Sequence, residues 1–182
     1  LFAKRSVLDE VGSFDPSFFM YYEEEDLCWR AHLRNYLVLF VPQAKIYHFG
    51  EKTAQHYPFK KYYYFHRNHT FLLIKNYAWF SLLKVLPKKF ALDAVMTFYF
   101  LLTGEWKRSL CVVAATLSLP FYLRNLLRSR EKTQSIRRRD EQEIWNMLYP
   151  KNIAMSFFLR RRKTFTELLE ESPSFRKQLL YR

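Results

Sequence analysis

Apolar residues recur at helical spacing through most of the chain beyond Pro58, and this pattern restricts the fold more than any other feature. Gly104 interrupts the pattern between two of the predicted helices. The polar run 129–139 predicts a linker that leads into a charged tail. The predicted helices cover residues 58–77, 80–103, 105–130, 140–149 and 164–180. The chain from Pro58 onward is therefore expected to be helical.

The segment before Pro58 carries both helix and strand signals. Apolar spacing predicts one helix over 4–11 and another over 23–34, which Asn35 is expected to stop. Short apolar runs on either side of a proline turn predict strands over 36–41 and 44–49. We therefore expect this segment to be the end of an α/β domain, so that the fold class is α/β with a mostly helical extension.

Charge is distributed unevenly along the chain, whose formal net charge is +13. Residues 1–57 hold 6 basic and 8 acidic groups, residues 58–123 hold 9 and 2, and residues 124–182 hold 15 and 7. A basic surface of this size suits nucleic acid, anionic lipid headgroups or phosphorylated substrates, and charge alone does not separate the three. We expect three segments: 1–57, a basic aromatic segment 58–130, and a charged tail 131–182.

Cysteine and glycine content excludes several classes of site. The 2 cysteines, Cys28 and Cys111, lie far apart, so they form neither a disulfide framework nor a zinc ribbon, and a reducing compartment is expected. Only 3 glycines are present, which argues against a glycine-rich phosphate loop. The chain begins with Leu1 and has no signal-peptide pattern, so we expect it to be an internal piece of a longer protein.

Two apolar runs, 90–102 and 109–123, lie within the basic segment. The second is 15 residues long, and about 20 are needed to cross a bilayer. Pro120 interrupts it, so no transmembrane helix is predicted. Helices with basic flanks suit the headgroup plane of a membrane, and a helical hairpin packed on a catalytic domain is the alternative. The flanking basic residues are Lys88, Lys89, Lys107, Arg108 and Arg124.

The acidic cluster 23–26 is the sharpest local signal. On a helical wheel Glu24 shares the apolar face with Leu27, whereas Asp26 faces Arg30. The ordinary explanation of Asp26 is an ion pair one turn apart, and that of Glu24 is a solvated helix cap. A carboxylate at the head of an apolar face can instead act as a general base when a substrate hydroxyl lies within hydrogen-bond reach.

None of the 5 histidines has the spacing of a two-histidine metal site with a neighbouring acid. His48 ends a strand-like run before Gly50, where a side chain can point into a cleft at a sheet edge, so it is a candidate ligand. For His66 and His69, ordinary packing among tyrosines is expected. The aromatic run 62–65 follows two lysines and suits base stacking, a sugar or diphosphate-lipid site, or a membrane interface, which we favour.

Several short motifs follow one another in a fixed order. They are Phe2-Ala3-Lys4-Arg5-Ser6-Val7, Val11-Gly12-Ser13-Phe14-Asp15, Phe18-Phe19-Met20-Tyr21-Tyr22-Glu23-Glu24-Glu25-Asp26-Leu27-Cys28-Trp29-Arg30-Ala31, Val41-Pro42-Gln43-Ala44, Tyr47-His48, Arg67-Asn68 and Lys75-Asn76. This series resembles the C-terminal half of bacterial family 2 glycosyltransferases, especially the rhamnosyltransferase-like members of cell-surface polysaccharide pathways. The likeness covers residues 1–76 well and the helices to about Arg130 loosely, and it implies the GT-A fold.

The resemblance implies transfer of a sugar, with inversion, from a nucleotide-diphosphate sugar to a cell-surface polysaccharide or lipid-linked acceptor. It places the catalytic base at Glu24, where the family more often has Asp, and leaves Asp26 as a second candidate. It also places acceptor-binding positions at Asp15, Trp29 and Arg30.

A divalent metal, Mg²⁺ or Mn²⁺, is implied by the same resemblance, with His48 as one ligand. The chain has no Asp-x-Asp motif, so we expect the rest of the metal site and the donor-binding half to lie upstream. The expected location is the cytoplasm at the inner face of the plasma membrane, with peripheral contact to anionic lipid and no nucleic-acid partner. The alternatives are a non-catalytic basic module that binds membrane or nucleic acid, and an inactive family member in which Glu24 is not a base.

Overall fold

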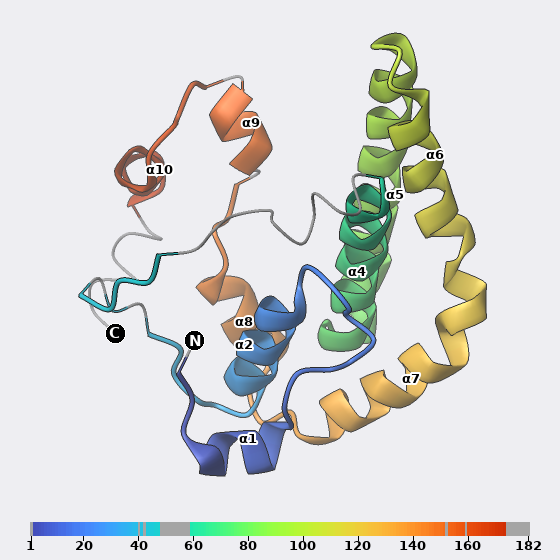
Figure 1. The fold of residues 1–182 in the computed structure, drawn as a ribbon. Helices are drawn as coiled ribbons and strands as arrows, with labels where there is room; N and C mark the ends of the chain where they lie inside the picture. The colour runs from blue at the N-terminus through green and yellow to red at the C-terminus, as the bar shows by residue number, and fades with distance from the viewer. Residues whose placement is uncertain are drawn as a thin grey trace. The chain divides into compact units, whose positions relative to one another are not determined.

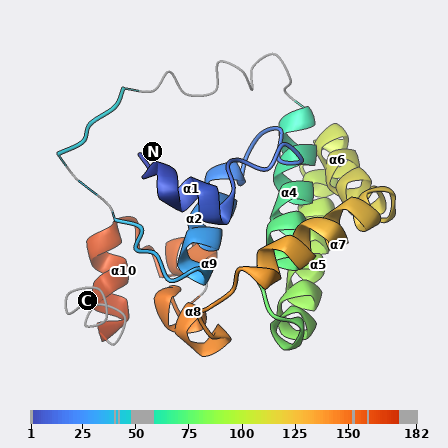
Figure 2. The same ribbon diagram turned by 90° about the horizontal axis from the view of Figure 1, so that it is seen from below.

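The computed structural model describes residues 2–39, 41, 43–47, 59–151, 153–158 and 160–173. The chain divides into two units, residues 1–138 and 139–182. The first unit contains α1 (Arg5–Val11), α2 (Glu23–Leu33), α4 (Lys60–Asn76), α5 (Trp79–Leu102), α6 (Trp106–Leu117) and α7 (Leu119–Ser135) (Figures 1 and 2). The second contains α8 (Glu141–Met147), α9 (Ile153–Phe158) and α10 (Phe165–Glu171).

The expected α/β fold is wrong for the described residues, which form helices and no strand. The described parts of the predicted strands 36–41 and 44–49 bond locally, as where the Ala44 N–H donates to the Val41 carbonyl at 3.0 Å. A strand persists only when a neighbouring strand exchanges ladder bonds with it, and the described residues provide no such neighbour. Tyr47 is accordingly 96% exposed. The GT-A assignment, which requires a sheet, is corrected with it.

The first two helices end at the positions that the sequence predicts. Gly12 follows α1 with φ +80°, and a Cβ there would lie 3.3 Å from Nη1 of Arg30. Asn35, just beyond α2, has φ +75°. A residue in the left-handed region cannot continue a right-handed helix, so both positions act as stops.

Helix α4 is central to the first unit and packs against α2, α5, α6 and α7 (Figures 1 and 2). Its Phe71 and Leu72 join Phe18, from the loop before α2, and Leu126, from α7, in the hydrophobic core. The rings of Phe18 and Phe71 meet edge to face with 6.3 Å between centroids, an arrangement that aromatic pairs favour. The core therefore fixes the loop that precedes α2 onto α4.

A break separates α6 from α7 within the single helix predicted over 105–130. The two helices meet at Ser118 with a bend of 52°. Pro120 lies in the first turn of α7, where its missing N–H is tolerated, whereas inside a continuous helix its ring would clash with the preceding turn. In the described part of the chain no single helix has the length and apolar character to cross a membrane, and α6 with α7 meets that test only as a bent pair.

The polar run 129–139, predicted as a linker, is helical as far as Ser135 and packs on α4. The last carbonyls of a helix have no donor within the helix. Arg130 and Gln134 supply donors to the carbonyls of residues 74–77, at the end of α4 and just beyond it. The linker prediction is wrong for residues 129–135, because polar side chains there cap another helix. The division between the two units falls after Arg138, inside the predicted run.

The second unit contains short helices, and side-chain caps begin α8 and α10. The carboxylate of Asp140 accepts a hydrogen bond from the Glu143 N–H at 2.8 Å, at the start of α8. Thr164 and Glu167 form a reciprocal capping box at the start of α10. Each cap satisfies N–H groups that have no partner inside the helix, which explains where these two helices begin.

Candidate functional site

Two consecutive tyrosines directly before α2 have left-handed backbone conformations. Tyr21 has φ +67° and Tyr22 has φ +69°. Bulky side chains rarely adopt this region, and a residue held there costs about 1–3 kcal/mol, so it persists only where its surroundings enforce it. Strain of this kind clusters at functional sites. The turn before α2 is therefore the first candidate for a site.

Two adjacent residues of α4 hold this turn. The amide nitrogen of the fully buried Asn68 donates to the carbonyls of Met20, at 2.6 Å, and Tyr21, at 3.0 Å. Arg67 donates through Nε to the amide oxygen of Asn68 at 2.9 Å, which orients that amide, and through Nη2 to the Ser17 carbonyl at 2.7 Å. The turn therefore keeps its conformation through donors from α4.

Three glutamates follow the turn and begin α2. Glu24 and Glu25 are exposed and Glu23 is half-buried. Burial raises the pKa of Glu23 and of Glu25, and the negative charge of Glu24 adds to both shifts. Oε2 of Glu23 is buried and accepts no hydrogen bond within the described residues. Carboxylates with raised pKa bind protons closer to neutral pH than ordinary glutamates, which suits acid–base chemistry.

Glu24 does not lie on the buried face of α2, where the helical wheel places it with Leu27. Leu27 is buried, whereas Glu24 faces solvent. The last turn of the loop and the exposed start of α2 leave its carboxylate open to an incoming molecule. A substrate hydroxyl can therefore approach Glu24 from solvent.

Asp26 is fully buried at the centre of an ion-pair hub. Its Oδ2 accepts from Arg30 Nε at 2.9 Å and from Lys75 Nζ at 2.8 Å, and its Oδ1 accepts from Asn76 Nδ2 at 3.0 Å. The ion pair with Arg30, expected from their spacing, is thus present. A carboxylate held by two cations and an amide away from solvent has no open position for an acceptor hydroxyl, so the geometry makes Asp26 an anchor of α2 on α4.

A polar cavity of about 290 Å³ lies beside this hub, between the loop after α1 and α7. Asp15, Arg30 and Lys75 contribute charged groups to its lining. Lys75 Nζ bonds to Oδ2 of Asp15 at 2.6 Å. Burial alone would raise the pKa of Asp15, but hydrogen bonds from Lys75 and Ser17 outweigh burial and lower it. Two of the three expected acceptor-binding residues, Asp15 and Arg30, therefore line one cavity.

Trp29, the third of these residues, does not line that cavity. Its ring packs edge to face against Tyr77, with 4.7 Å between centroids, and it borders the hydrophobic core. The structure therefore places Trp29 in packing between α2 and the residue that follows α4.

A second buried polar cluster links α5 to the strained turn. Nδ1 of His66 lies 2.7 Å from Oδ1 of Asp93, and Lys89 pairs with the other oxygen of Asp93. His69 stacks on Tyr22 with 5.2 Å between ring centroids and 6° between planes. Burial lowers the pKa of His69 to about 4, and the charge of Lys89 adds to the shift. His69 is therefore neutral near pH 7.

The expected metal ligand, His48, lies outside the described residues. Within the residues that are described, no group of three or more His, Cys, Asp or Glu side chains could hold a metal ion.

The residues that hold the turn and the hub form two similar pairs on α4, Arg67-Asn68 and Lys75-Asn76. Both pairs belong to the motif series, and the resemblance assigns neither of them a role. Their separation of 8 residues is close to two helical turns, so both pairs lie near one face of α4. This repeat of a basic residue followed by Asn is the signal that could have identified them.

Comparisons with models of protein families, with curated proteins and with solved structures found no match.

Proposed function

We propose that this chain takes part in glycosyl transfer and that Glu24 is the base that activates the acceptor. The observation that carries the proposal is the exposed carboxylate of Glu24 at the strained Tyr21–Tyr22 turn, between two carboxylates of raised pKa. The motif series around the acidic cluster supports the same reaction class. The proposal concerns these residues and does not depend on a sheet.

The proposed reaction is a single displacement. The acceptor oxygen forms a bond to the anomeric carbon of a nucleotide-diphosphate sugar while the bond from that carbon to the diphosphate oxygen breaks. Glu24 takes the proton of the acceptor hydroxyl, and the nucleoside diphosphate leaves with the bonding electrons. Because attack and departure occur on opposite faces, the configuration inverts.

The polar cavity beside the hub is proposed to hold a sugar unit of the acceptor. Sugar hydroxyls both donate and accept hydrogen bonds, and the lining of the cavity includes the carboxylate of Asp15, the hydroxyl of Ser129 and the exposed Lys132. The low pKa of Asp15 keeps this group ionised and able to accept from hydroxyls near neutral pH.

Substitution of Glu24 by Gln tests the proposal. The full chain is incubated with a panel of nucleotide-diphosphate sugars and with bacterial membranes as the acceptor source, and release of nucleoside diphosphate is measured. Glu24→Gln should lower turnover by about 100-fold or more, the usual contribution of a general base, while donor binding stays unchanged. Asp9→Asn, at an exposed carboxylate of α1 outside the acidic cluster, is the control and should retain most activity. Near-parental turnover of Glu24→Gln would remove the base role.

A second proposal, peripheral contact with an anionic membrane, is favoured by the surface of α5, α6 and α7. Large apolar side chains are exposed along all three helices; Phe80, Leu102 and Phe121 are 83%, 88% and 86% exposed. Exposed apolar surface of this extent is typical of interaction sites. Other exposed members are Leu83, Val95, Phe98, Trp106, Leu110, Leu117 and Leu123.

The structure changes which basic residues can contact lipid headgroups. Lys89 is buried and paired with Asp93, and Arg108 pairs with Glu105. Lys88, in contrast, is exposed. The headgroup contacts proposed here are therefore made by exposed basic residues of α5 and α7, namely Lys84, Lys88, Arg124 and Arg128.

Sedimentation with vesicles that contain phosphatidylglycerol tests this contact. A basic residue near an anionic surface contributes about 1 kcal/mol, so Lys84→Gln combined with Lys88→Gln should weaken binding by roughly 30-fold. Lys4→Gln combined with Lys45→Gln removes the same charge from exposed positions outside these helices and should change binding little. Equal loss in both variants would show that net charge, and not this surface, causes the binding.

A further inference from the structure

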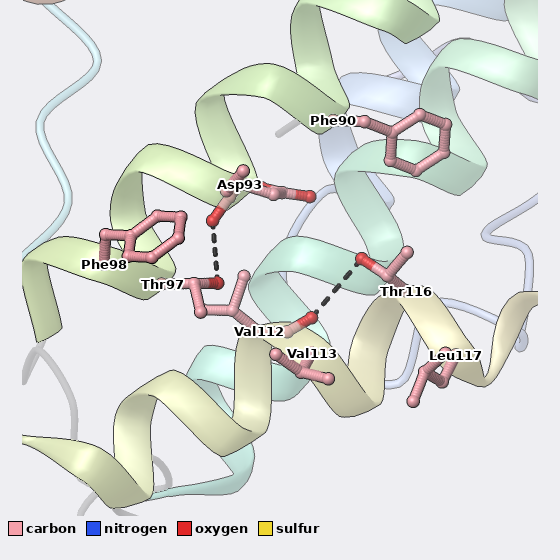
Figure 3. A pocket seen from close by; sticks show the side chains of 9 residues that line it. Phe90, Asp93, Thr97, Phe98, Val112, Val113, Thr116 and Leu117 are labelled. Carbon is pink, nitrogen blue, oxygen red and sulfur yellow. Dashed lines mark hydrogen bonds between the residues drawn. The ribbon is translucent and has the colours of Figure 1, made fainter. Parts of the chain in front are cut away.

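A groove of about 380 Å³ between α5 and α6 is lined mostly by apolar side chains (Figure 3). Its polar groups already have partners. Thr97 and Thr116 donate to carbonyls of their own helices at 2.8 and 3.4 Å. The carboxylate of Asp93 is bonded to His66 and Lys89. A chemically activated side chain lies instead where α4 packs against the junction of α6 and α7.

This activated side chain is Tyr63, near the start of α4. Its phenol is hydrogen-bonded with Ser118 at the α6–α7 junction, Tyr122 on α7, and Arg67 one turn further along α4. Tyr122 donates in this set, because its hydrogen bond to Tyr63 raises the pKa of Tyr122. Burial alone would raise the pKa of Tyr63, but the hydrogen bonds outweigh burial and lower it. The ionised phenol, which is the nucleophilic form, is therefore stabilised.

The groups around the Tyr63 phenol indicate which chemical group it can accept. The guanidinium of Arg67 is buried and lies 5.5 Å from the ring centroid of Tyr63 and 5.0 Å from that of Tyr122. A guanidinium pairs with phosphate through parallel N–H bonds, and the hydroxyls of Tyr122 and Ser118 add further donors. An uncharged acyl group on the same oxygen would give these donors no anion. The set therefore matches a phosphoryl group, which the half-buried Tyr63 can receive from the solvent side.

Arg67 also connects Tyr63 to the strained turn before α2. Its Nη2 donates to the Ser17 carbonyl at 2.7 Å, and its Nε donates to the amide oxygen of Asn68 at 2.9 Å. A hydrogen bond to a charged acceptor is roughly twice as strong as one to a neutral acceptor. A phosphoryl group on Tyr63 therefore competes with the Ser17 carbonyl for the guanidinium, and the turn loses one of its donors.

We propose that Tyr63 is a modification site that accepts a phosphoryl group from a nucleoside triphosphate, and that the product loosens the turn before α2. The phenol oxygen forms a bond to the γ-phosphorus while the bond from that phosphorus to the oxygen of the leaving nucleoside diphosphate breaks. The phenol proton passes to the carboxylate base of a tyrosine kinase, which supplies the nucleotide. The consequence for Glu24 rests on the proposed glycosyl transfer, whereas the modification site does not.

Diisopropyl fluorophosphate, a small phosphoryl donor that releases fluoride, tests the reactivity of Tyr63. The full chain is incubated with the reagent, and labelled residues are mapped over time by mass spectrometry. Tyr63 should be labelled before Tyr62 and Tyr64, its neighbours in the sequence, which serve as internal controls. Tyr122→Phe removes one donor and should slow labelling of Tyr63 by about 2–10-fold. Tyr99→Phe, at an exposed position of α5, is the matched control and should leave the rate unchanged.

A phosphonate analogue tests the effect on the turn. The full chain is prepared with 4-phosphonomethyl-phenylalanine in place of Tyr63 or, as the control, in place of Tyr62, and amide hydrogen exchange is measured at Tyr21. The analogue at position 63 should accelerate exchange at Tyr21 by about 10–150-fold, which corresponds to loss of the bond between Arg67 and the Ser17 carbonyl. The analogue at position 62 should leave this exchange unchanged.

Equal labelling of the three neighbouring tyrosines, labelling of Ser118 in place of Tyr63, or an unchanged rate in Tyr122→Phe would overturn the modification site. Unchanged exchange at Tyr21 with the analogue at position 63, or acceleration spread over the whole first unit, would overturn the effect on the turn. Neither measurement requires turnover. Absence of transfer activity in the parent would therefore remove the proposed function and leave this inference standing.

Discussion

Replacement of Asp26 by Asn tests the buried ion-pair hub, because Asn keeps the shape of the side chain and removes its charge. Arg30 and Lys75 then lose a charged acceptor at 2.9 and 2.8 Å while they stay 4% and 3% exposed. Removing one partner of a buried ion pair costs about 3–5 kcal/mol. Lys75 keeps Asp15, and Arg30 keeps the backbone carbonyls of the loop after α1. We therefore expect the free energy of unfolding to fall by about 3 kcal/mol, at the lower end of that range.

Asp9→Asn is the matched control for this prediction. Arg5 and Asp9 are also four residues apart in a helix with an Nε–Oδ1 distance of 2.9 Å, but their side chains are 89% and 60% exposed. Exposed pairs contribute about 0–1 kcal/mol. Urea unfolding followed by far-ultraviolet circular dichroism measures both variants against the parent. If Asp26→Asn costs no more than Asp9→Asn, burial is not the source of the hub's energy and the reasoning is refuted.

Three further predictions concern the turn and the titrating groups. Asn68→Ala removes the donor to two carbonyls of the strained turn and should lower the free energy of unfolding by about 2–3 kcal/mol, with faster amide exchange at Tyr21. Asp15 has a lowered pKa, so its contribution to stability is complete above its ordinary value of 3.8 and is lost as pH falls below it; Asp15→Asn should flatten the stability profile there. The pKa of His69 is lowered from 6.5 to about 4, so its contribution is complete above pH 6.5 and is lost as pH falls toward 4. His69→Phe keeps a ring against Tyr22 and should remove this loss of stability at low pH. A loss of the same size in the variant would contradict burial of a neutral imidazole.

Apolar spacing predicted the helices. Whether a segment is a strand or a linker depends on its contacts with distant segments, and a local sequence pattern does not show these contacts. The run 36–41 looks like a strand because its residues favour extended backbone, and whether it pairs depends on another segment. The run 129–139 looks like a linker because it is polar. Its polarity is used to cap α4, through contacts such as that of Gln134 with the carbonyl of Lys75, 59 residues away.

Local spacing in the sequence predicted only part of the candidate site. Spacing predicted the Asp26–Arg30 ion pair, whereas Lys75 reaches Asp26 from 49 residues away and could not be inferred from the local pattern. The strained turn gave no sequence signal, because Tyr21 and Tyr22 occupy backbone conformations that usually select Gly or Asn. The run of acidic residues located the cluster in the sequence. Which of its members are exposed to solvent could be known only from the fold.

Helix α4 holds the acidic cluster at both of its ends. The free-energy cost of the strained turn before the cluster can be compared with the free energy of the hydrogen bonds that hold this turn. Two left-handed tyrosines cost about 2–6 kcal/mol together. The two bonds from Asn68 contribute about 0.5–1.5 kcal/mol each, and the bond from the charged Arg67 contributes about 1.5–3 kcal/mol. These two sums are similar, so the turn has little surplus stability of its own. It relies on Lys75 and Asn76, which fix Asp26 at the end of the cluster. The position of Glu24 therefore depends on α4 at two points, and a change at either should move the carboxylate before it unfolds the chain.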